Sequence, residues 1–555
     1  MRRVLLAVIV VPLGLLGQTS VLSPEKTEDH SASACLVAGR VATAAEGSPL
    51  KSARVALVAE HWKSENRVYA ATTDDDGRFL LKDLAPGRYH FFATRAGFVD
   101  QEYQSQGTDG GAPLSLKPGQ KIDDVLFRMT AAGVITGRVV NEENEAMSHI
   151  QIVALRRPTE EEEDEPWFAS RKQTPIPVAS GHTDDRGQYR IFGLKPGEYY
   201  VRATDSFEPD SWGIAVSQDY WIRQNLGSEY APVYYPGVLQ VGQAQVVSVR
   251  PGDEVQADFS LQRLKTVEVA GRVIGPEGPV KNVSVHLEQS GVDGADRQDT
   301  TDDKGNFRIK GVPPGSYVIM AYQRAEGEHV YEAQGREKVE VGGESIESLT
   351  IFLGRGATVR GRITVAGAGS VTLDRVGVGL LPTEGDEQFG GHGRVKKDGS
   401  FEITSVKDGS YAISLWGLDH EWYIKSARLG PDDVLEKGLQ VEKGVSGGRL
   451  EITISSASAQ LEGSVTDGDQ AMIGARVRIT PDPETPYNRS RACSATTDQT
   501  GHFSVAALAP GKYRAIAKSQ ALPGSESLKS EPQTITLSEH DHQTVALTMV
   551  TSEAH

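Results

Sequence analysis

Cysteine is almost absent from this 555-residue sequence, in which only Cys35 and Cys493 occur. A disulfide between them would have to join the two ends of the chain, so we expect two thiols instead. A lipid anchor on Cys35 would require a leucine or a similar residue directly after an apolar leader, and Ala32-Ser33-Ala34 lies too far along the chain. The two cysteines therefore predict neither a disulfide nor a lipid anchor.

The chain has fewer basic than acidic residues, with 58 Lys and Arg against 75 Asp and Glu, and its formal net charge is −17. This balance excludes nucleic acids and anionic membrane surfaces as expected partners. Aromatic residues make up only 7% of the chain, whereas 59 glycines and 27 prolines are present. Such a composition suits many short strands that are joined by turns.

Long apolar runs are missing except at the N-terminus. Arg2 and Arg3 precede the apolar stretch 4–16, which predicts a signal peptide over residues 1–20 with cleavage between Gly17 and Ser20. The alternative is an uncleaved anchor, although this stretch is short for a span of about 20 residues. We therefore expect an exported protein that is secreted, periplasmic or on the cell surface, with no membrane span after cleavage.

One pattern recurs five times, and its clearest copy is the range 301–321. Asp303-Lys304-Gly305 is typical of a turn, because Asp bonds nearby backbone and Gly accepts a positive φ. Apolar residues alternate with polar ones from Phe307 onward, which predicts a half-buried strand. Pro314-Gly315 suits the centre of a type II turn, and a second alternating strand follows from Tyr317.

The spacing within the pattern is constant. The first glycine of each copy is followed by an aromatic residue two positions later and by a second glycine ten positions later, and a tyrosine lies two positions beyond that. The first glycines are Gly77, Gly187, Gly305, Gly399 and Gly501, and the tyrosines are Tyr89, Tyr199, Tyr317, Tyr411 and Tyr513. An opening strand with its own glycine precedes each copy: Gly39, Gly137, Gly271, Gly361 and Gly463.

The distance between copies indicates whole domains. Repeats roughly 90 to 135 residues apart are too long for solenoid units and are large enough for separate hydrophobic cores. The sequence therefore predicts an all-β chain, a tandem array of five β-sandwich domains with almost no linkers. After a tether over 21–34, the predicted domains are 35–132, 133–266, 267–356, 357–457 and 458–551.

The pattern T-D-x-x-G-x-F…L-x-P-G-x-Y resembles that of the carboxypeptidase regulatory-like domain. That family is a transthyretin-like β-sandwich, related in shape to Cna-B-type modules of bacterial surface proteins and to carbohydrate-binding-like folds. The resemblance covers nearly the whole mature chain and implies five Greek-key sandwiches. Such domains serve as spacers, binding modules and appendages to enzymes, so the resemblance implies a fold more than a function.

This resemblance makes a zinc site worth testing, because metallocarboxypeptidases use an H-x-x-E pair. His329-Val330-Tyr331-Glu332 matches that pair, but two fixed positions arise easily by chance and zinc needs further ligands. The cluster Asp74–Asp76 lacks the alternating spacing of an EF-hand loop, which favours a solvated turn over a calcium site. We therefore predict no catalytic residue, no metal and no cofactor.

The second predicted domain carries two insertions. The acidic run Glu160–Glu165 is typical of a solvated loop. The insertion 205–237 is rich in aromatic residues, which either stack on a ligand such as a sugar ring or pack against the sandwich. The candidate ligand-binding residues are Trp212, Tyr220, Trp221, Tyr230, Tyr234 and Tyr235. In the fourth domain, Gly390, Gly391 and Gly393 predict a mobile loop.

Taken together, these features predict an exported, non-catalytic protein whose sandwiches bind or space other molecules. The expected partners are a polysaccharide or a cell-envelope protein, and the aromatic insertion is the candidate surface for carbohydrate binding if its rings do not pack against the sandwich. The alternative function is that of an accessory or degenerate carboxypeptidase-associated protein, which depends on the family resemblance alone.

Overall fold

The computed structural model describes residues 34–60, 67–105, 110–159, 175–205, 230–263, 265–289, 297–324, 331–354, 356–367, 371–383, 390–418, 421–442, 448–519 and 528–550. The predicted signal peptide over 1–20, the residues 21–33 of the tether and the run Glu160–Glu165 lie outside this part of the chain. Nearly every described element is a β-strand, which confirms the all-β prediction.

The described strands of the predicted range 35–132, called sandwich 1, form two sheets. In the first sheet β1 lies between β4 and β8, and in the second sheet β5 lies beside β2, β6 and β7. The strands are β1 (Cys35–Thr43), β2 (Arg54–Ala59), β3 (Val68–Thr72), β4 (Arg78–Leu84), β5 (Gly87–Thr94), β6 (Gln101–Glu102), β7 (Leu114–Leu116) and β8 (Lys121–Met129).

Residues 133–266, called sandwich 2, repeat this arrangement. The opening strand β9 pairs with β12, β16 and β17, while β13 pairs with β10, β14 and β15. The elements are β9 (Gly133–Val140), β10 (Gln151–Arg156), β11 (Ile176–His182), β12 (Gln188–Leu194), β13 (Gly197–Thr204), β14 (Val233–Tyr234), the 3-10 helix η3 (Val241–Gln243), β15 (Val247–Val249), β16 (Glu254–Gln256) and β17 (Phe259–Ser260).

Residues 267–356, called sandwich 3, form one sheet around β18 and a second sheet in the order β21-β20-β23-β24. The strands are β18 (Val267–Gly275), β19 (Gly278–Pro279), β20 (Ser284–Gln289), β21 (Arg297–Thr300), β22 (Asn306–Val312), β23 (Gly315–Arg324), β24 (Tyr331–Val341) and β25 (Ile346–Phe352).

Residues 357–457, called sandwich 4, form the sheets β29-β26-β34-β31-β32 and β28-β27-β30-β33. The elements are β26 (Ala357–Ala366), η4 (Leu373–Arg375), β27 (Gly377–Pro382), β28 (Gly391–Arg394), β29 (Ser400–Val406), β30 (Gly409–Trp416), β31 (Tyr423–Leu429), β32 (Asp432–Asp433), the short helix α4 (Val434–Lys437), β33 (Leu439–Val441) and β34 (Arg449–Ser455).

The described strands of the predicted range 458–551, called sandwich 5, form sheets around β35 and β40 that are linked where β41 pairs with β43. The elements are β35 (Ala459–Asp467), β36 (Gln470–Ala471), β37 (Arg476–Pro481), η5 (Arg489–Arg491), β38 (Cys493–Thr496), β39 (His502–Leu508), β40 (Gly511–Lys518), β41 (Lys529–Ser530), β42 (Gln533–Leu537) and β43 (His542–Val550).

In every sandwich the opening strand is parallel to a closing strand. β1 is parallel to β8, β18 to β25, β26 to β34 and β35 to β43, while β9 is parallel to β16 and β17. The strand of the repeated turn pairs with the opposite edge of the opening strand in antiparallel fashion, as β22 does with β18. The opening strand is therefore central to its sheet.

Five large clusters of buried side chains occur in the described residues, and each draws on one predicted range only. In sandwich 3, for example, Phe307, Ile309, Tyr317 and Ile319 are all at most 3% exposed. We propose that each cluster is the core of a separate domain, because no cluster mixes residues from two ranges.

The aspartate of the repeated turn is fixed by backbone donors. Asp302 Oδ1 accepts hydrogen bonds from the backbone nitrogens of Lys304 and Asn306, both at 2.8 Å. Asp74, Asp184 and Asp498 accept the same pair of bonds in their copies. These carboxylates complete tight turns, and Gly305 follows with a φ of +76°. The prediction that Asp74 belongs to a turn is thus confirmed.

The tyrosine of each copy bonds the backbone four residues before it. Tyr317 Oη donates to the carbonyl oxygen of Pro313 at 2.9 Å, and Tyr89, Tyr199, Tyr411 and Tyr513 make the same contact. Burial raises the pKa of Tyr317 to about 12, so its hydroxyl keeps the donated proton at neutral pH.

Two local expectations are wrong. Gly315 has a φ of +159° and begins β23, whereas the third position of a type II turn needs about +80°. The predicted mobile loop around Gly391 instead contains the strand β28. Gly393 allows close packing there, because a Cβ at that position would lie 2.3 Å from the carbonyl oxygen of Glu402.

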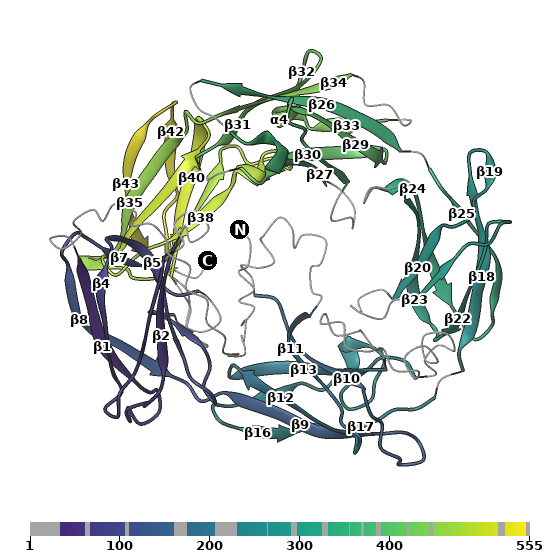
Figure 1. Cartoon of the computed structure of the whole chain (residues 1–555), viewed down its shortest axis with the longest axis horizontal. Helices are drawn as coiled ribbons and strands as arrows, with labels where there is room; N and C mark the ends of the chain where they lie inside the picture. Colours follow the sequence, from purple (N-terminus) through teal and green to yellow (C-terminus); the bar gives the residue numbers. More distant parts are fainter. Residues whose placement is uncertain are drawn as a thin grey trace, which may run out of the picture.

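The sandwiches are arranged in a ring (Figure 1). The sheet with the opening strand lies on the outside of the ring, and the second sheet faces the centre. Sandwich 1, at the start of the chain, lies beside sandwich 5, at its end.

Candidate functional site

Half of the predicted ligand-binding residues cannot be placed. Trp212, Tyr220 and Trp221 lie outside the described residues, so their role in binding stays a prediction. Tyr230 is described and is partly exposed. Its hydroxyl accepts a hydrogen bond from Arg263 Nε at 3.1 Å, and the Arg263 guanidinium lies 6.0 Å from the ring centroid.

The other two tyrosines of the insertion pack against sandwich 2. Tyr234 is 3% exposed and forms a small cluster with Val153, Leu155 and Tyr200. Tyr235 packs edge-on against Phe259, with ring centroids 5.9 Å apart. The burial of Tyr234 and the ring contact of Tyr235 favour packing against the sandwich over stacking on a ligand. Their assignment as ligand-binding residues stays a prediction.

The candidate zinc pair lies only partly within the described residues. His329 lies outside the described part, and the strand β24 begins at Tyr331. Within the described ranges, no group of three or more His, Cys, Asp or Glu side chains could hold a metal ion. The described ranges also include no helix of the length and apolarity that a membrane crossing needs.

A G-x-S-x-G pattern at residues 444–448 was not among the predicted features. In α/β-hydrolases this pattern places a nucleophilic serine on a turn from a strand to a helix. Here residues 444–447 lie outside the described ranges, and the described strands before and after the pattern are β33 and β34.

Neither cysteine environment favours reactivity. Cys35 is 1% exposed, and its thiol donates to the carbonyl oxygen of Lys117 at 3.0 Å. Burial raises the pKa of the Cys493 thiol to about 12. A thiolate is the reactive form of cysteine, so Cys493 remains protonated and unreactive at neutral pH.

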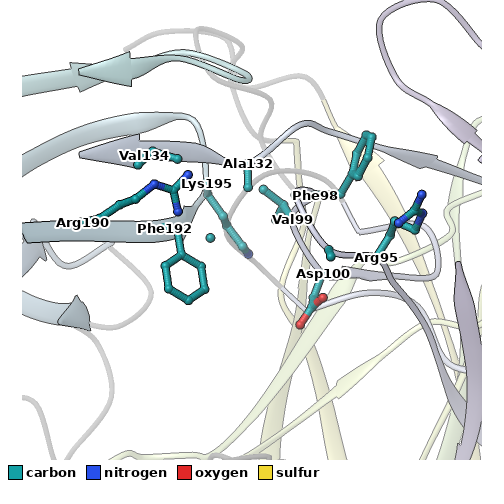
Figure 2. Close-up of a pocket in the computed structure, with 12 residues that line it drawn as sticks. Arg95, Phe98, Val99, Asp100, Ala132, Val134, Arg190, Phe192 and Lys195 are labelled. Carbon is teal, nitrogen blue, oxygen red and sulfur yellow. The ribbon is translucent and has the colours of Figure 1, made fainter. Parts of the chain in front are cut away.

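A cavity of about 500 Å³ lies where sandwich 1 meets sandwich 2 (Figure 2). Its walls come from the loop 95–100 after β5, from the start of β9 and from the end of β12. This volume is within the range of small-molecule sites. The cavity exists only because the two sandwiches are held side by side.

The cavity combines an exposed aromatic ring with charged groups. Phe192 is 69% exposed, the highest value among the exposed large hydrophobic residues of the described part of the chain. The Arg190 guanidinium lies 5.8 Å from the centroid of this ring. Figure 2 shows Lys195 extending into the space between Phe192 and Asp100. Burial raises the pKa of Asp100 above its usual value.

The repeated pattern contains a sequence signal for Phe192, which was not among the predicted site residues. The residues at the position of Phe192 in the other four copies are Lys82, Lys310, Thr404 and Ala506. Only sandwich 2 therefore places an aromatic side chain on this outward-facing position of the strand. Comparison of the copies could have identified Phe192, although not the second wall of the cavity.

The comparison with protein families matches two stretches of the chain. Residues 37–120 and 268–353 match the carboxypeptidase regulatory-like domain. These stretches belong to sandwiches 1 and 3, so the resemblance seen in the repeated pattern is confirmed. A stretch of 278 residues, 47% of the chain, is 21% identical to Colossin-A of Dictyostelium discoideum. The chain spans about 2% of the length of that relative.

Solved structures with some similarity include bacterial pilins. The Bacillus anthracis TIE protein is 12% identical, with 72% of this chain and 68% of that chain covered and a TM-score of 0.15. The minor pilin of Streptococcus agalactiae is 15% identical, with 41% and 96% covered and a TM-score of 0.22. The major pilin subunit of Bacillus cereus is 11% identical, with 58% and 99% covered and a TM-score of 0.13. At these TM-scores the similarities carry no argument about function.

Proposed function

Because the chain contains carboxypeptidase regulatory-like domains, we propose that it is an exported, non-catalytic scaffold that spaces and presents binding surfaces at the cell envelope. The observation that carries this proposal is the construction of the joints. β8 ends at Met129 and β9 begins at Gly133. Between them, Ala132 N donates to Gly97 O at 2.9 Å and Gly252 N donates to Ala131 O at 3.2 Å. The joint is thus bound to both sandwiches.

The joint between sandwiches 4 and 5 is held by side chains as well. Tyr487 Oη and Ser410 Oγ are hydrogen-bonded at 3.1 Å. Lys425 Nζ lies 2.6 Å from Glu539 Oε1, and this ion pair lowers the pKa of Glu539. Contacts across a joint restrict rotation of the domains, as a rigid spacer requires and a flexible tether does not.

Limited proteolysis of the full chain tests this scaffold. A non-specific protease is expected to leave the joints 130–132 and 456–458 intact while it cleaves exposed loops, because their backbone is hydrogen-bonded to neighbouring sandwiches. Mass spectrometry of the early fragments identifies the sites. Early cleavage at either joint, with release of intact single sandwiches, would show flexible linkers and contradict the proposal.

The alternative is that of a carboxypeptidase-associated accessory protein. It predicts stoichiometric zinc in the purified chain and peptide hydrolysis that depends on His329 and Glu332. Metal analysis of the purified protein separates the two functions, because a scaffold needs no zinc.

We also propose a ligand class for the cavity between sandwiches 1 and 2, namely a polysaccharide that bears carboxylate groups. Aromatic rings stack on sugar rings, and Phe192 offers such a ring. Arg190 and Lys195 supply positive charge for a carboxylate. Asp100 can accept a hydrogen bond from a sugar hydroxyl group.

Calorimetric titration of the full chain with polygalacturonate, and with neutral dextran for comparison, tests this assignment. We expect binding of the polyuronate only, and a loss of roughly tenfold or more for Arg190→Ala, because a hydrogen bond to a charged group contributes about 1.5–3 kcal/mol. Phe192→Ala is expected to weaken binding as well.

Phe352→Ala is the matched control for the ring, because Phe352 is 65% exposed on β25 of sandwich 3. Equal binding by the Phe192→Ala and Phe352→Ala variants would remove this cavity as the site. In that case the aromatic insertion with Trp212, Tyr220 and Trp221 would remain the candidate.

A further inference from the structure

We propose that sandwich 5 docks on sandwich 1, so that a single chain closes into a ring. Figure 1 shows these two sandwiches side by side although they are separated by the three others in the sequence. The contact joins the turn between β38 and β39 of sandwich 5 to the second sheet of sandwich 1.

The centre of the contact is the open edge of β7. One edge of this strand pairs with β5, where Tyr89 lies opposite Leu114 and Gly87 opposite Leu116. The backbone groups of Ser115 therefore point away from β5. Gln499 Oε1 accepts from Ser115 N at 2.9 Å, and Gln499 Nε2 donates to Ser115 O at 2.7 Å. The amide side chain thus pairs with this edge as another strand would.

A second set of contacts involves charge. Arg88 lies on β5, and its guanidinium lies 3.8 Å from Asp498 Oδ2 and 3.4 Å from the carbonyl oxygen of Thr496. Glu60 of sandwich 1 holds the same guanidinium at 2.9 Å. The Asp498 side chain is only 6% exposed, and a charge pair that is shielded from water is stronger than an exposed one. Charge and backbone pairing therefore act at the same place.

The sequence restricts this contact to the first and last copies. The position of Gln499 is occupied by an ionised side chain in the other turns: Asp75, Asp185, Asp303 and Lys397. A carboxylate cannot donate to Ser115 O, and an ammonium group cannot accept from Ser115 N. The position of Arg88 is occupied by Glu198, Ser316, Ser410 and Lys512 in the other copies. Only sandwich 1 places an arginine opposite the Asp498 carboxylate.

Closure within one chain competes with head-to-tail pairing between chains. A heterologous contact of this kind either closes a ring or builds an open polymer. Here the intervening sandwiches hold the two surfaces close together, which favours pairing within one chain over pairing between chains at low protein concentration. At micromolar protein concentrations the contact is therefore made within one chain.

The test uses the full mature chain, with light scattering for mass and small-angle X-ray scattering for shape. Gln499→Asp introduces the residue that Asp185 provides in sandwich 2, so the turn is kept while the amide donor is lost. Arg88→Glu is the second variant and places a carboxylate against Asp498. Asp185→Gln, the reverse change at the matching exposed turn, is the control. Circular dichroism verifies that each variant is folded.

We expect a monomeric wild-type chain whose scattering fits the closed ring, and an increased longest dimension in both variants but not in the control. An open arc for the wild type, with the same scattering as the two variants, would overturn the proposal. Oligomers that form with rising concentration and vanish in the Gln499→Asp variant would also overturn it, because they would place the contact between chains.

Discussion

The substitution Gly271→Ala is expected to destabilise sandwich 3 by about 3 kcal/mol, at the upper end of the range for overpacked sites. For a domain of this size, that loss lowers the unfolding temperature by about 12 °C or more. The expected change is large for the addition of a single methyl group, and its cause is the backbone of the neighbouring strand.

Gly271 lies in β18 between two partners, opposite Phe307 of β22 and Leu349 of β25. A Cβ at this position would lie 2.1 Å from the carbonyl oxygen of Leu349 and 2.9 Å from its Cβ. The pairing of β18 with β25 shifts register between Val269 and Gly271, so the backbones approach closely here. A carbonyl in a strand pair cannot move aside without breaking the pairing.

Differential scanning calorimetry of the full chain measures this effect, because the transition that shifts is that of sandwich 3. The control is Gly343→Ala, where a Cβ would meet nothing within 4 Å and no positive φ is required. If the two variants unfold at the same temperature, the close approach of β18 and β25 does not explain why position 271 requires glycine.

The second large effect is expected for Thr301→Val, a change that keeps the shape and removes a hydroxyl group. Thr301 is 3% exposed. Its Oγ1 accepts from Val283 N at 2.9 Å and donates to Val280 O at 2.8 Å. Because valine leaves buried backbone groups without this partner, we expect a loss of about 2–3 kcal/mol, visible in the same calorimetric transition. Thr300→Val is the control, because Thr300 directly precedes Thr301 and its side chain is exposed.

Sandwich 4 shows why this threonine is not needed everywhere. Val395 occupies the equivalent position, and the 3-10 helix η4 replaces the missing hydroxyl group, because Leu373 O accepts from Val376 N at 3.0 Å. A destabilisation by Thr300→Val that equals that of Thr301→Val would contradict the role given to the buried hydroxyl group.

The fold could be predicted from the sequence because its signals are local. A positive φ at Gly305, an aspartate two residues before a backbone donor and alternating burial from Phe307 onward all act within a few residues. They recur in every copy except where sandwich 4 substitutes Lys396 for the aspartate; there Asp398 Oδ1 accepts from Ser400 N at 3.0 Å instead. Repetition made each weak local signal decisive.

The candidate sites could not be predicted in the same way, because they depend on how whole sandwiches meet. Phe192 and Asp100 are far apart in the sequence and share a cavity only through the joint after Met129. Ser115 and Gln499 are separated by most of the chain. The aromatic content of the insertion drew attention to Tyr234, whose ring packs beneath residues that follow it, such as Val238 and Val241.

The parallel pairing of first and last strands gives every sandwich a particular response to force. If the protein is pulled along its chain, the load enters β18 at one end and leaves β25 at the other. Parallel neighbours are then sheared past each other, and their hydrogen bonds must break together rather than one at a time. Strands whose hydrogen bonds break one at a time would separate at low force, whereas this geometry makes each sandwich resist stretching.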